Sequence, residues 1–301
     1  MTEPQLTVCP FTGRVGMWTS LREQRPQPRP QRLLLDPDAP GCPFCTLDDP
    51  DPRLLPLEAQ VDQDRWFAMH NIYPPIDGPT GTADLACATE HGPTLTHRHP
   101  RLAAQWAAMI LVQQQLVARR ADRWSMVSAA TGRSAGASQH HPHGHVLTPA
   151  VVPPATIRRQ ERWSDPEVPQ VLFADVTTVS VVDGVRLVAA PVPLGPLDLW
   201  LVPESGQRFL DADARAIAAL IEDWVVGVHR QLEAAGQQDP EPDDRIAPFD
   251  AKVVLHPELP DGTGRWWGEL AVTDRHAPGV AAVPLVDLRH PPATQAANFR
   301  P

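Results

Sequence analysis

Residues 134–146 read SAGASQHHPHGHV, the stretch of this sequence that is richest in reactive side chains. On an extended strand alternate residues share one face, so His141, His143 and His145 are predicted to point the same way. One of them can then face a metal while the next faces a substrate phosphate. An imidazole can attack phosphorus and form a covalent phosphoramidate, which divides one displacement into two steps. The pattern therefore predicts histidine-based phosphate chemistry.

The loop before these histidines is predicted to hold the phosphate. It carries small residues, and its backbone N–H groups, including that of Gly136, and the Ser138 hydroxyl can donate to phosphate oxygens. Histidine-rich stretches are also common as adventitious metal binders or solvated loops. That alternative does not account for the loop of glycine and serine residues before the histidines, nor for the cysteine pair described next.

Two cysteines and two histidines form a candidate metal site. Cys42 and Cys45 make a C-x-x-C turn, which places two thiolates on one side of a metal, and His91 and His141 both stand at predicted strand ends. Two imidazoles would complete a tetrahedral zinc shell. A closed Cys2His2 set is structural and does not activate water. The alternatives are a surface turn with free thiols, and redox use of the pair.

The chain around these motifs alternates strand-like and helical segments, and we expect an α+β fold. Residues 1–55 are rich in Pro, Asp and Arg and are predicted to be an irregular arm. Short apolar runs and helical spacing of apolar residues then predict, in the first half, strands at 83–90 and 124–130 and a helix at 100–122.

The second half repeats this plan, with strands predicted at 185–190 and 198–202 and a helix at 211–233. A constant offset of 114 places four residues of the first half on four of the second: Leu85, Glu90, His91 and Gly92 on Leu199, Glu204, Ser205 and Gly206. The shared order of strand, turn, helix and strand favours an internal duplication. We expect the boundary between residues 160 and 161, giving halves 1–160 and 161–301.

The totals exclude several classes of protein. The 301 residues carry a net charge of -10 with Lys252 as the only lysine, which argues against broad binding to nucleic acid or anionic membranes. No apolar run approaches the roughly 18 residues of a membrane span, and residues 1–10 lack signal-peptide features. Four cysteines are too few for a disulfide scaffold of this size. We therefore expect a soluble cytoplasmic protein.

Taken in order, four segments give the sequence a family resemblance. SAGASQHHPHGHV is similar to the active-site segment of the galactose-1-phosphate uridylyltransferase family, a branch of the histidine-triad superfamily, whose pattern is Gly-x-Ser, two residues, then His-Pro-His-Gly-Gln. Three further segments resemble its N-terminal segment, its zinc turn and the strand end that supplies a zinc histidine: PFTGRVGMWTSLREQRP (10–26), DPDAPGCPFC (36–45) and ATEHGPTL (88–95). The matching motifs span roughly residues 9–150, and a weaker match continues to Arg289.

The resemblance implies a set of roles. His143 is the nucleophile that accepts a nucleoside monophosphate, and zinc is held by Cys42, Cys45, His91 and His141. Substrate contacts are implied for Ser138, Arg22, Arg25 and Asn71. The implied fold is two histidine-triad-like halves with antiparallel-rich sheets flanked by helices, paired into a homodimer. Because Ser205 replaces the metal histidine in the second half, only the first half is expected to be catalytic.

The sequence also departs from the family pattern. His145 stands where the transferases have Gln; both side chains can donate to a phosphoryl oxygen, but a histidine can also assist water. Ala130 stands where the family has Asn. The family's sugar-holding Gly-Tyr-Glu segment is echoed by residues 266–269, which include Glu269, and its sugar-phosphate lysine has no match.

These observations predict a nucleotidyltransferase that acts on a nucleotide sugar, similar to a UDP-hexose:hexose-1-phosphate uridylyltransferase, through a covalent nucleotidyl-histidine. A sugar phosphate or another phosphorylated compound is the expected acceptor. Two alternatives stay open: a nucleotide-phosphate hydrolase or phosphorylase of the histidine-triad superfamily, which His145 favours, and a non-catalytic zinc and nucleotide-binding module, which Ala130 favours.

Overall fold

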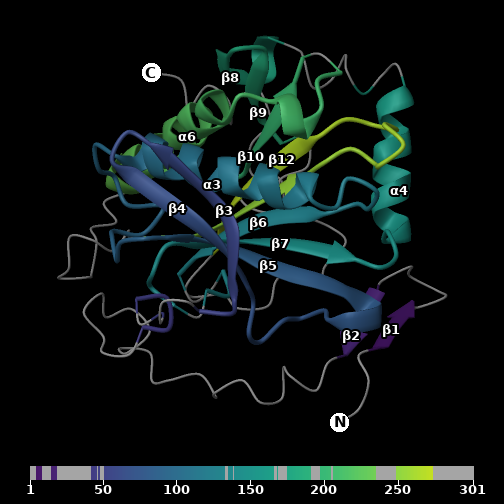
Figure 1. Cartoon of the computed structure of the whole chain (residues 1–301). Coiled ribbons are helices and arrows are strands. Elements are labelled where there is room, and N and C mark those ends of the chain that lie inside the picture. The colour runs from purple at the N-terminus through teal and green to yellow at the C-terminus, as the bar shows by residue number, and fades with distance from the viewer. Residues whose placement is uncertain are drawn as a thin grey trace.

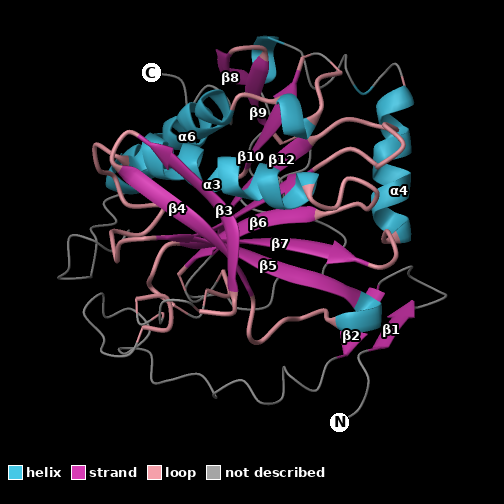
Figure 2. Cartoon of the chain, in the orientation of Figure 1, coloured by secondary structure: helices cyan, strands magenta, loops and turns pink. Residues whose placement is uncertain are grey.

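The computed structural model describes residues 5–8, 15–18, 42–45, 47, 51–132, 135–137, 139–165, 168, 175–190, 197–204, 206–234 and 249–273. Within these residues a ten-stranded antiparallel sheet carries helices on one face (Figures 1 and 2). None of the described helices has the length and apolar character needed to cross a membrane. The fold is sheet-rich α+β, as the sequence predicts.

The first half supplies five strands and one long helix to this sheet. In chain order these are β3 (Leu54–Val61), β4 (Asp64–His70), β5 (Gly81–Ala88), α3 (Leu102–Ala118), β6 (Met126–Thr131) and β7 (His143–Pro149). Before them lie a separate two-stranded ladder, β1 (Gln5–Val8) and β2 (Val15–Trp18). A short 3-10 turn, η1 (Gly78–Thr80), precedes β5, and α4 (Pro154–Glu161) and η2 (Arg162–Ser164) follow β7.

The second half supplies the same set of elements in the same order. These are β8 (Thr178–Val182), β9 (Val185–Ala189), β10 (Leu199–Pro203), α6 (Ala214–Ala234), β11 (Asp250–His256) and β12 (Trp267–Thr273), with 3-10 turns η3 (Asp175–Thr177) and η4 (Phe209–Asp211).

The strand order of the sheet is the same when read inward from either edge. It runs β3-β4-β5-β7-β6-β11-β12-β10-β9-β8, so each half contributes its first three strands, then its fifth, then its fourth. The halves meet where β6 pairs with β11, with Val253 opposite Ala129. In each half the first two strands of the sheet form a hairpin with a two-residue turn. The first residue of the turn, Asp62 or Asp183, has a positive φ. The two halves therefore share one topology.

Helices α3 and α6 lie side by side across one face of the sheet (Figure 2). The apolar residues whose spacing predicts the second helix are all buried against this face: Ile217, Leu220, Ile221, Trp224 and Val228. They join Trp106, Met109 and Ile110 of α3 in the main core. Removing each such side chain from water contributes about 1.5–3 kcal/mol, which offsets the cost of ordering the two helices.

The predicted element positions are largely confirmed. The helices predicted at 100–122 and 211–233 are α3 and α6, and the four predicted strands are β5, β6, β9 and β10. The prediction that residues 1–55 form only an irregular arm is wrong, because β1 and β2 pair there and β3 begins at Leu54. Backbone pairing between two four-residue strands leaves little periodicity to detect. The histidine stretch predicted to be extended is β7, and seven strands were not predicted: β1, β2, β3, β4, β8, β11 and β12.

Candidate active site and metal centre

The second face of the sheet, opposite α3 and α6, carries the predicted metal ligands at the end of β5 and the start of β7. Cys42 and Cys45 lie in one turn, His91 follows β5, and His141 immediately precedes β7. One ligand atom from each lies within 4.8 Å of all the others. The Sγ of Cys45 is 3.4 Å from Nδ1 of His91 and 3.3 Å from Nδ1 of His141, and the Sγ of Cys42 is 3.6 Å from Nδ1 of His141.

These separations fit one tetrahedral metal. Ligands bound to zinc at about 2.0–2.3 Å stand roughly 3.3–3.8 Å from one another. Nε2–H of His141 donates to the backbone oxygen of Ala88 at 2.8 Å, which turns Nδ1 toward the sulfurs. Burial lowers the pKa of His141 to about 4, so the ring is neutral at neutral pH and can serve as a ligand. The four residues that the sequence predicted can therefore hold a metal ion together.

In the metal-free protein the Cys45 thiol is held in its protonated form. Burial, together with the hydrogen bond and charge of Cys42, raises the pKa of Cys45 to about 11. Two thiolates a few ångströms apart repel each other in a partly buried site. A bound dication removes this repulsion, so metal binding and thiol deprotonation are coupled.

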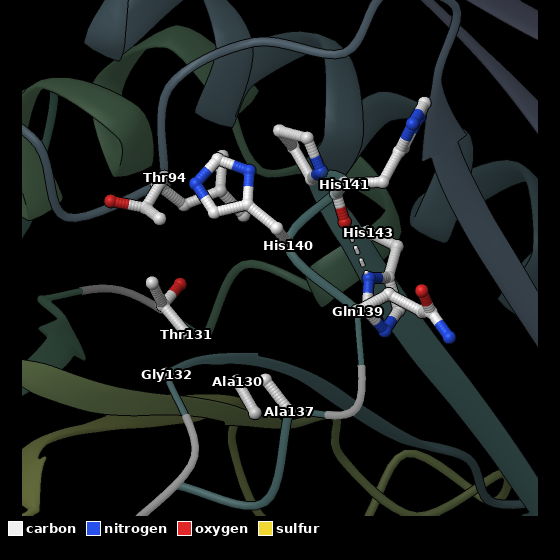
Figure 3. Close-up of a pocket in the computed structure, with 11 residues that line it drawn as sticks. Thr94, Ala130, Thr131, Gly132, Ala137, Gln139, His140, His141 and His143 are labelled. Carbon is white, nitrogen blue, oxygen red and sulfur yellow. Dashed lines mark hydrogen bonds between the residues drawn. The ribbon is translucent and has the colours of Figure 1, made fainter. Parts of the chain in front are cut away.

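His143 is the first residue of β7 and is buried, with 5% of its surface exposed. Its Nδ1–H donates to the backbone oxygen of His141 at 2.7 Å, the dashed line in Figure 3. This bond assigns the proton to Nδ1 and leaves the lone pair on Nε2. The rings of His145 and Phe44 lie 5.2 Å from that of His143. The hydrogen bond therefore fixes the His143 ring with Nδ1 toward the backbone and Nε2 on the other side of the ring.

The back of this strand is pressed against α3. Gly144 has no side chain there, and a Cβ would lie 2.8 Å from Sδ of Met109 and even closer to Nε2 of Gln113. Gln113, which is buried, donates to the backbone oxygen of Ser128 at 3.2 Å and reaches that of His145 at 3.5 Å. The amide thus joins β6 to β7 directly behind the two histidines. A metal on the four ligands would join the 42–45 turn to the start of β7 and the end of β5.

A hollow that is open to solvent adjoins His143 (Figure 3). Figure 3 shows Ala130 and Ala137 on one side of it and the His140 ring and Thr94 on the other. No carboxylate belongs to the described residues that line it: Thr94, Leu95, Ala130, Thr131, Gly132, Ala137, Gln139, His140, His141, Pro142 and His143. A lining of hydroxyl, amide, imidazole and backbone groups can accommodate a phosphorylated compound without repelling it.

The loop predicted to hold phosphate is described only in part. Gly136 has φ 90, and the N–H of Ala137 donates to the backbone oxygen of Gly132 at 3.0 Å, which folds the loop back toward β6. Ser138, Arg22 and Arg25 lie outside the described residues, so their phosphate contacts stay predictions.

Asn71 lies in the turn after β4. Its Oδ1 accepts a hydrogen bond from the N–H of Tyr73 at 2.9 Å, and its own N–H donates to the oxygen of Ala83 at the start of β5. The turn is thereby fixed to the strand that leads to the metal. The Asn71 amide N–H groups point away from this internal bond and can donate elsewhere.

Glu269 lies far from His143 in the sheet of a single chain. It lies on β12, three strands away from β7, which corresponds to roughly 14 Å across the sheet. Its Oε1 lies 3.5 Å from Nε2 of His256 and 3.6 Å from Nη1 of Arg159. Burial alone would raise the pKa of Glu269, but its bond with His256 and the charge of Arg159 leave that pKa lower than usual. Glu269 is thus an ionised carboxylate in a cluster of its own.

Sequence reasoning missed three residues of this site. Phe44, inside the C-x-x-C turn, packs on His141 and His143. His140 stacks on His91 at 5.5 Å with nearly parallel rings, and with Thr94 it forms a wall of the hollow. The doubled histidine in QHHPHGH was a signal for His140. Phe44 and Thr94 are ordinary residues whose place depends on chain segments far apart in sequence.

No family model and no curated protein sequence matches the chain. Solved structures match over almost its full length. An ADP-glucose phosphorylase from Arabidopsis thaliana, with bound ADP-glucose, is 17% identical with a TM-score of 0.64, covering 99% of this chain and 98% of that one. A GalT-like protein from the same plant is 16% identical with a TM-score of 0.61, covering 99% of both chains.

A uridylyltransferase is 15% identical with a TM-score of 0.69, covering 98% of this chain and 96% of that one. The chain therefore has the fold that the uridylyltransferase, the GalT-like protein and the ADP-glucose phosphorylase share. The resemblance stated from the sequence motifs is confirmed at the level of the fold.

Proposed function

We propose that this protein is a nucleotidyltransferase that acts on a nucleotide sugar through a nucleotidyl-His143 intermediate. The observation that carries the proposal is the hydrogen bond from Nδ1–H of His143 to the His141 backbone, which leaves Nε2 as the nucleophilic atom. The hollow beside His143 is lined by hydroxyl, amide and imidazole groups that can contact the phosphates.

The reaction has two displacements at the same phosphorus. Nε2 of His143 forms a bond to the α-phosphorus, and the bond from that phosphorus to the bridging oxygen breaks, releasing a sugar phosphate. A phosphate oxygen of the acceptor then forms a new bond to the α-phosphorus while the N–P bond breaks. The proton stays on Nδ1 of His143 and remains hydrogen-bonded to the His141 backbone oxygen throughout. This hydrogen bond stabilises the positive charge that the ring gains.

Zinc is the metal that the Cys42, Cys45, His91 and His141 donor set fits best, since thiolate and imidazole together suit it. When bound, zinc supplies structural support and neutralises the two thiolates. The chain's own residues position the nucleophile. The backbone carbonyl of His141 accepts the hydrogen bond that orients His143, and Gln113 donates hydrogen bonds on the opposite face of the sheet.

His145 decides between transfer and hydrolysis. Its ring lies 5.2 Å from that of His143, so it can donate to a phosphoryl oxygen in the first step. It can also orient a water molecule toward the intermediate, which favours a hydrolase as the second candidate function. A phosphorylase, in which inorganic phosphate is the acceptor, is the other alternative. One solved structure with this fold is an ADP-glucose phosphorylase with its nucleotide sugar bound, which supports a nucleotide sugar as donor in either case.

We further propose that two copies of the chain pair, and that the halves arose by duplication. Glu269 is three strands away from His143, and the family resemblance implies a homodimer, so we propose that Glu269 of a second copy contacts the sugar. The shared strand order supports the duplication, and no second set of metal ligands occurs in the described part of the later half. Catalysis is accordingly assigned to residues 1–160.

Intact-protein mass spectrometry after mixing with a panel of nucleotide sugars tests the function. We expect a mass gain of one nucleoside monophosphate, mapped to His143, and its size identifies the base. His143→Ala should give no gain while keeping one equivalent of zinc. A control, Thr96→Val, removes a buried hydroxyl that lies outside the hollow and should label normally.

The same mixture followed without an acceptor separates the two candidate functions. A single burst of released sugar phosphate, equal to the enzyme present, supports transfer to another acceptor. Sustained turnover without acceptor identifies a hydrolase. If neither a mass gain nor any release occurs with the whole panel, the enzyme assignment is wrong and the chain is a binding module.

A further inference from the structure

Lys252, the only lysine of the chain, lies in the middle of β11 and is exposed. In the sheet register it stands opposite Ala130 of β6. Among the described residues Lys252 makes no hydrogen bond or ion pair, although Glu269 feels its charge. Glu269 already has Arg159 and His256 as partners. The ammonium group of Lys252 is thus left available to another anion.

The register places Lys252 and His143 on the same face of the sheet. Residues directly opposite each other in neighbouring strands share a face, and so do alternate residues along a strand. Ser128 stands opposite His145, so Ala130, two residues along β6, shares the face of His145 and His143. Lys252, opposite Ala130, shares it too.

On the intervening strand β6, the side chain between Lys252 and His143 is small. Only β6 lies between β7 and β11, which puts the backbones of His143 and Lys252 about 10 Å apart. The residue between them is Ala130, which ends at its Cβ and lines the hollow beside His143. Two side chains that project from the same face at this spacing leave a gap of the size that a phosphate group fills when it contacts both.

We infer that Lys252 binds the phosphate of the leaving group in the first step and of the acceptor in the second. The inference rests on the proposed nucleotidyl transfer. As the bond between the α-phosphorus and the bridging oxygen breaks, the electron pair stays on that oxygen, and the ammonium group stabilises the resulting charge on the sugar phosphate. In the second step the same ammonium group orients the acceptor phosphate, with no proton transferred to or from Lys252.

The kinetic test compares a substitution that removes the charge of Lys252 at similar side-chain length with one that keeps the charge. Lys252→Met should lower kcat/KM for nucleotidylation of His143 by about 10- to 100-fold, the effect of losing one charge-assisted hydrogen bond, and Lys252→Arg should restore part of it. The zinc content should not change. Arg215→Met removes the same charge from α6, on the opposite face of the sheet, and should leave the rate unchanged.

A second test needs no catalysis. Because Lys252 is the only lysine, acetylation by an amine reagent reports on it alone, apart from the α-amino group, and peptide mapping separates the two. UDP-glucose, ADP-glucose or inorganic pyrophosphate should slow acetylation of Lys252 several-fold without slowing that of the α-amino group. Equal rates with and without all three compounds would overturn the inference.

The two tests distinguish the inference from the proposed function. Protection of Lys252 without any adduct on His143 supports the phosphate contact and refutes nucleotidyl transfer. Normal adduct formation in Lys252→Met, without protection in the wild type, refutes the phosphate contact and leaves the transfer intact. A loss of rate shared equally by Lys252→Met and Arg215→Met also refutes it, because the effect is then one of net charge.

Discussion

At the scale of single residues, Gly144 decides how closely the histidine strand approaches α3. Its φ is ordinary, so the requirement is for space and not for an unusual backbone. The glycine stands between His143 and His145, and its missing side chain is what lets Gln113 reach the backbone oxygens of Ser128 on β6 and His145 on β7. The glycine therefore lets β7 pack closely on α3, and this packing positions the imidazoles of His143 and His145.

Gly144→Ala should destabilise the protein by about 1–3 kcal/mol, the usual cost of forcing a methyl group into a packed interior. Nucleotidylation of His143 should slow as well, because β7 must move away from α3. Urea unfolding and the mass assay measure the two effects. The matched control is Gly206→Ala, where a Cβ meets no atom within 4 Å and little change is expected. Equal stability of the two variants would contradict the tight approach.

At the scale of elements, a metal on the four ligands would join the 42–45 turn to two strand ends that already pair with each other. The 42–45 turn, the end of β5 and the start of β7 each supply ligands. His91 and His141 are 50 residues apart, and each is placed by its own strand. The closed set of four ligands has no open position for a substrate, which is typical of a structural zinc site.

Cys45→Ser should lose about one equivalent of zinc and lower the melting temperature. Cys45 is the exposed member of the set, so a chelator should have the same effect on the wild type. Inductively coupled plasma mass spectrometry and thermal unfolding measure both. Cys87→Ala, which removes a buried thiol that is not in the ligand set, should keep the zinc. Full zinc retention by Cys45→Ser would exclude this site.

At the scale of the whole molecule, the two halves form one continuous structure. The sheet crosses from one half to the other at β6 and β11, and α3 packs on α6. Gln114 of α3 adds a polar link, because its amide donates to the backbone oxygens of Phe209 at 2.7 Å and of Ala212 at 2.9 Å. We expect the halves to unfold together.

Gln114→Met should destabilise the protein by about 2–5 kcal/mol, since each buried carbonyl left without a donor costs roughly 1–3 kcal/mol. The loss should shift a single unfolding transition, measured by calorimetry. Gln115→Met is the control, because Gln115 makes one exposed bond, to the Glu58 backbone. Two separate transitions in the variant would mean that the halves unfold independently.

Local sequence patterns predicted the long helices and most of the metal centre. The apolar spacing in α3 and α6 fixes which side of each helix is buried, because the period of a helix is a local property. The C-x-x-C turn and the HPHGH strand are also local, so their residues could be named from spacing and chemistry. Strands β11 and β12 were missed because a strand at the centre of the sheet lacks a clear alternation when both of its faces are buried.

The sequence by itself determined the reactive groups of this protein, which are the histidines of one strand and a pair of thiols. It also determined the apolar faces of two helices. Only the tertiary structure decided which strands are neighbours. It set Lys252 two strands from His143 and Glu269 three strands away, on strands that the sequence did not locate. The physical reason is that strand pairing uses backbone hydrogen bonds common to all residues, so the choice of partner depends on packing across the whole sheet.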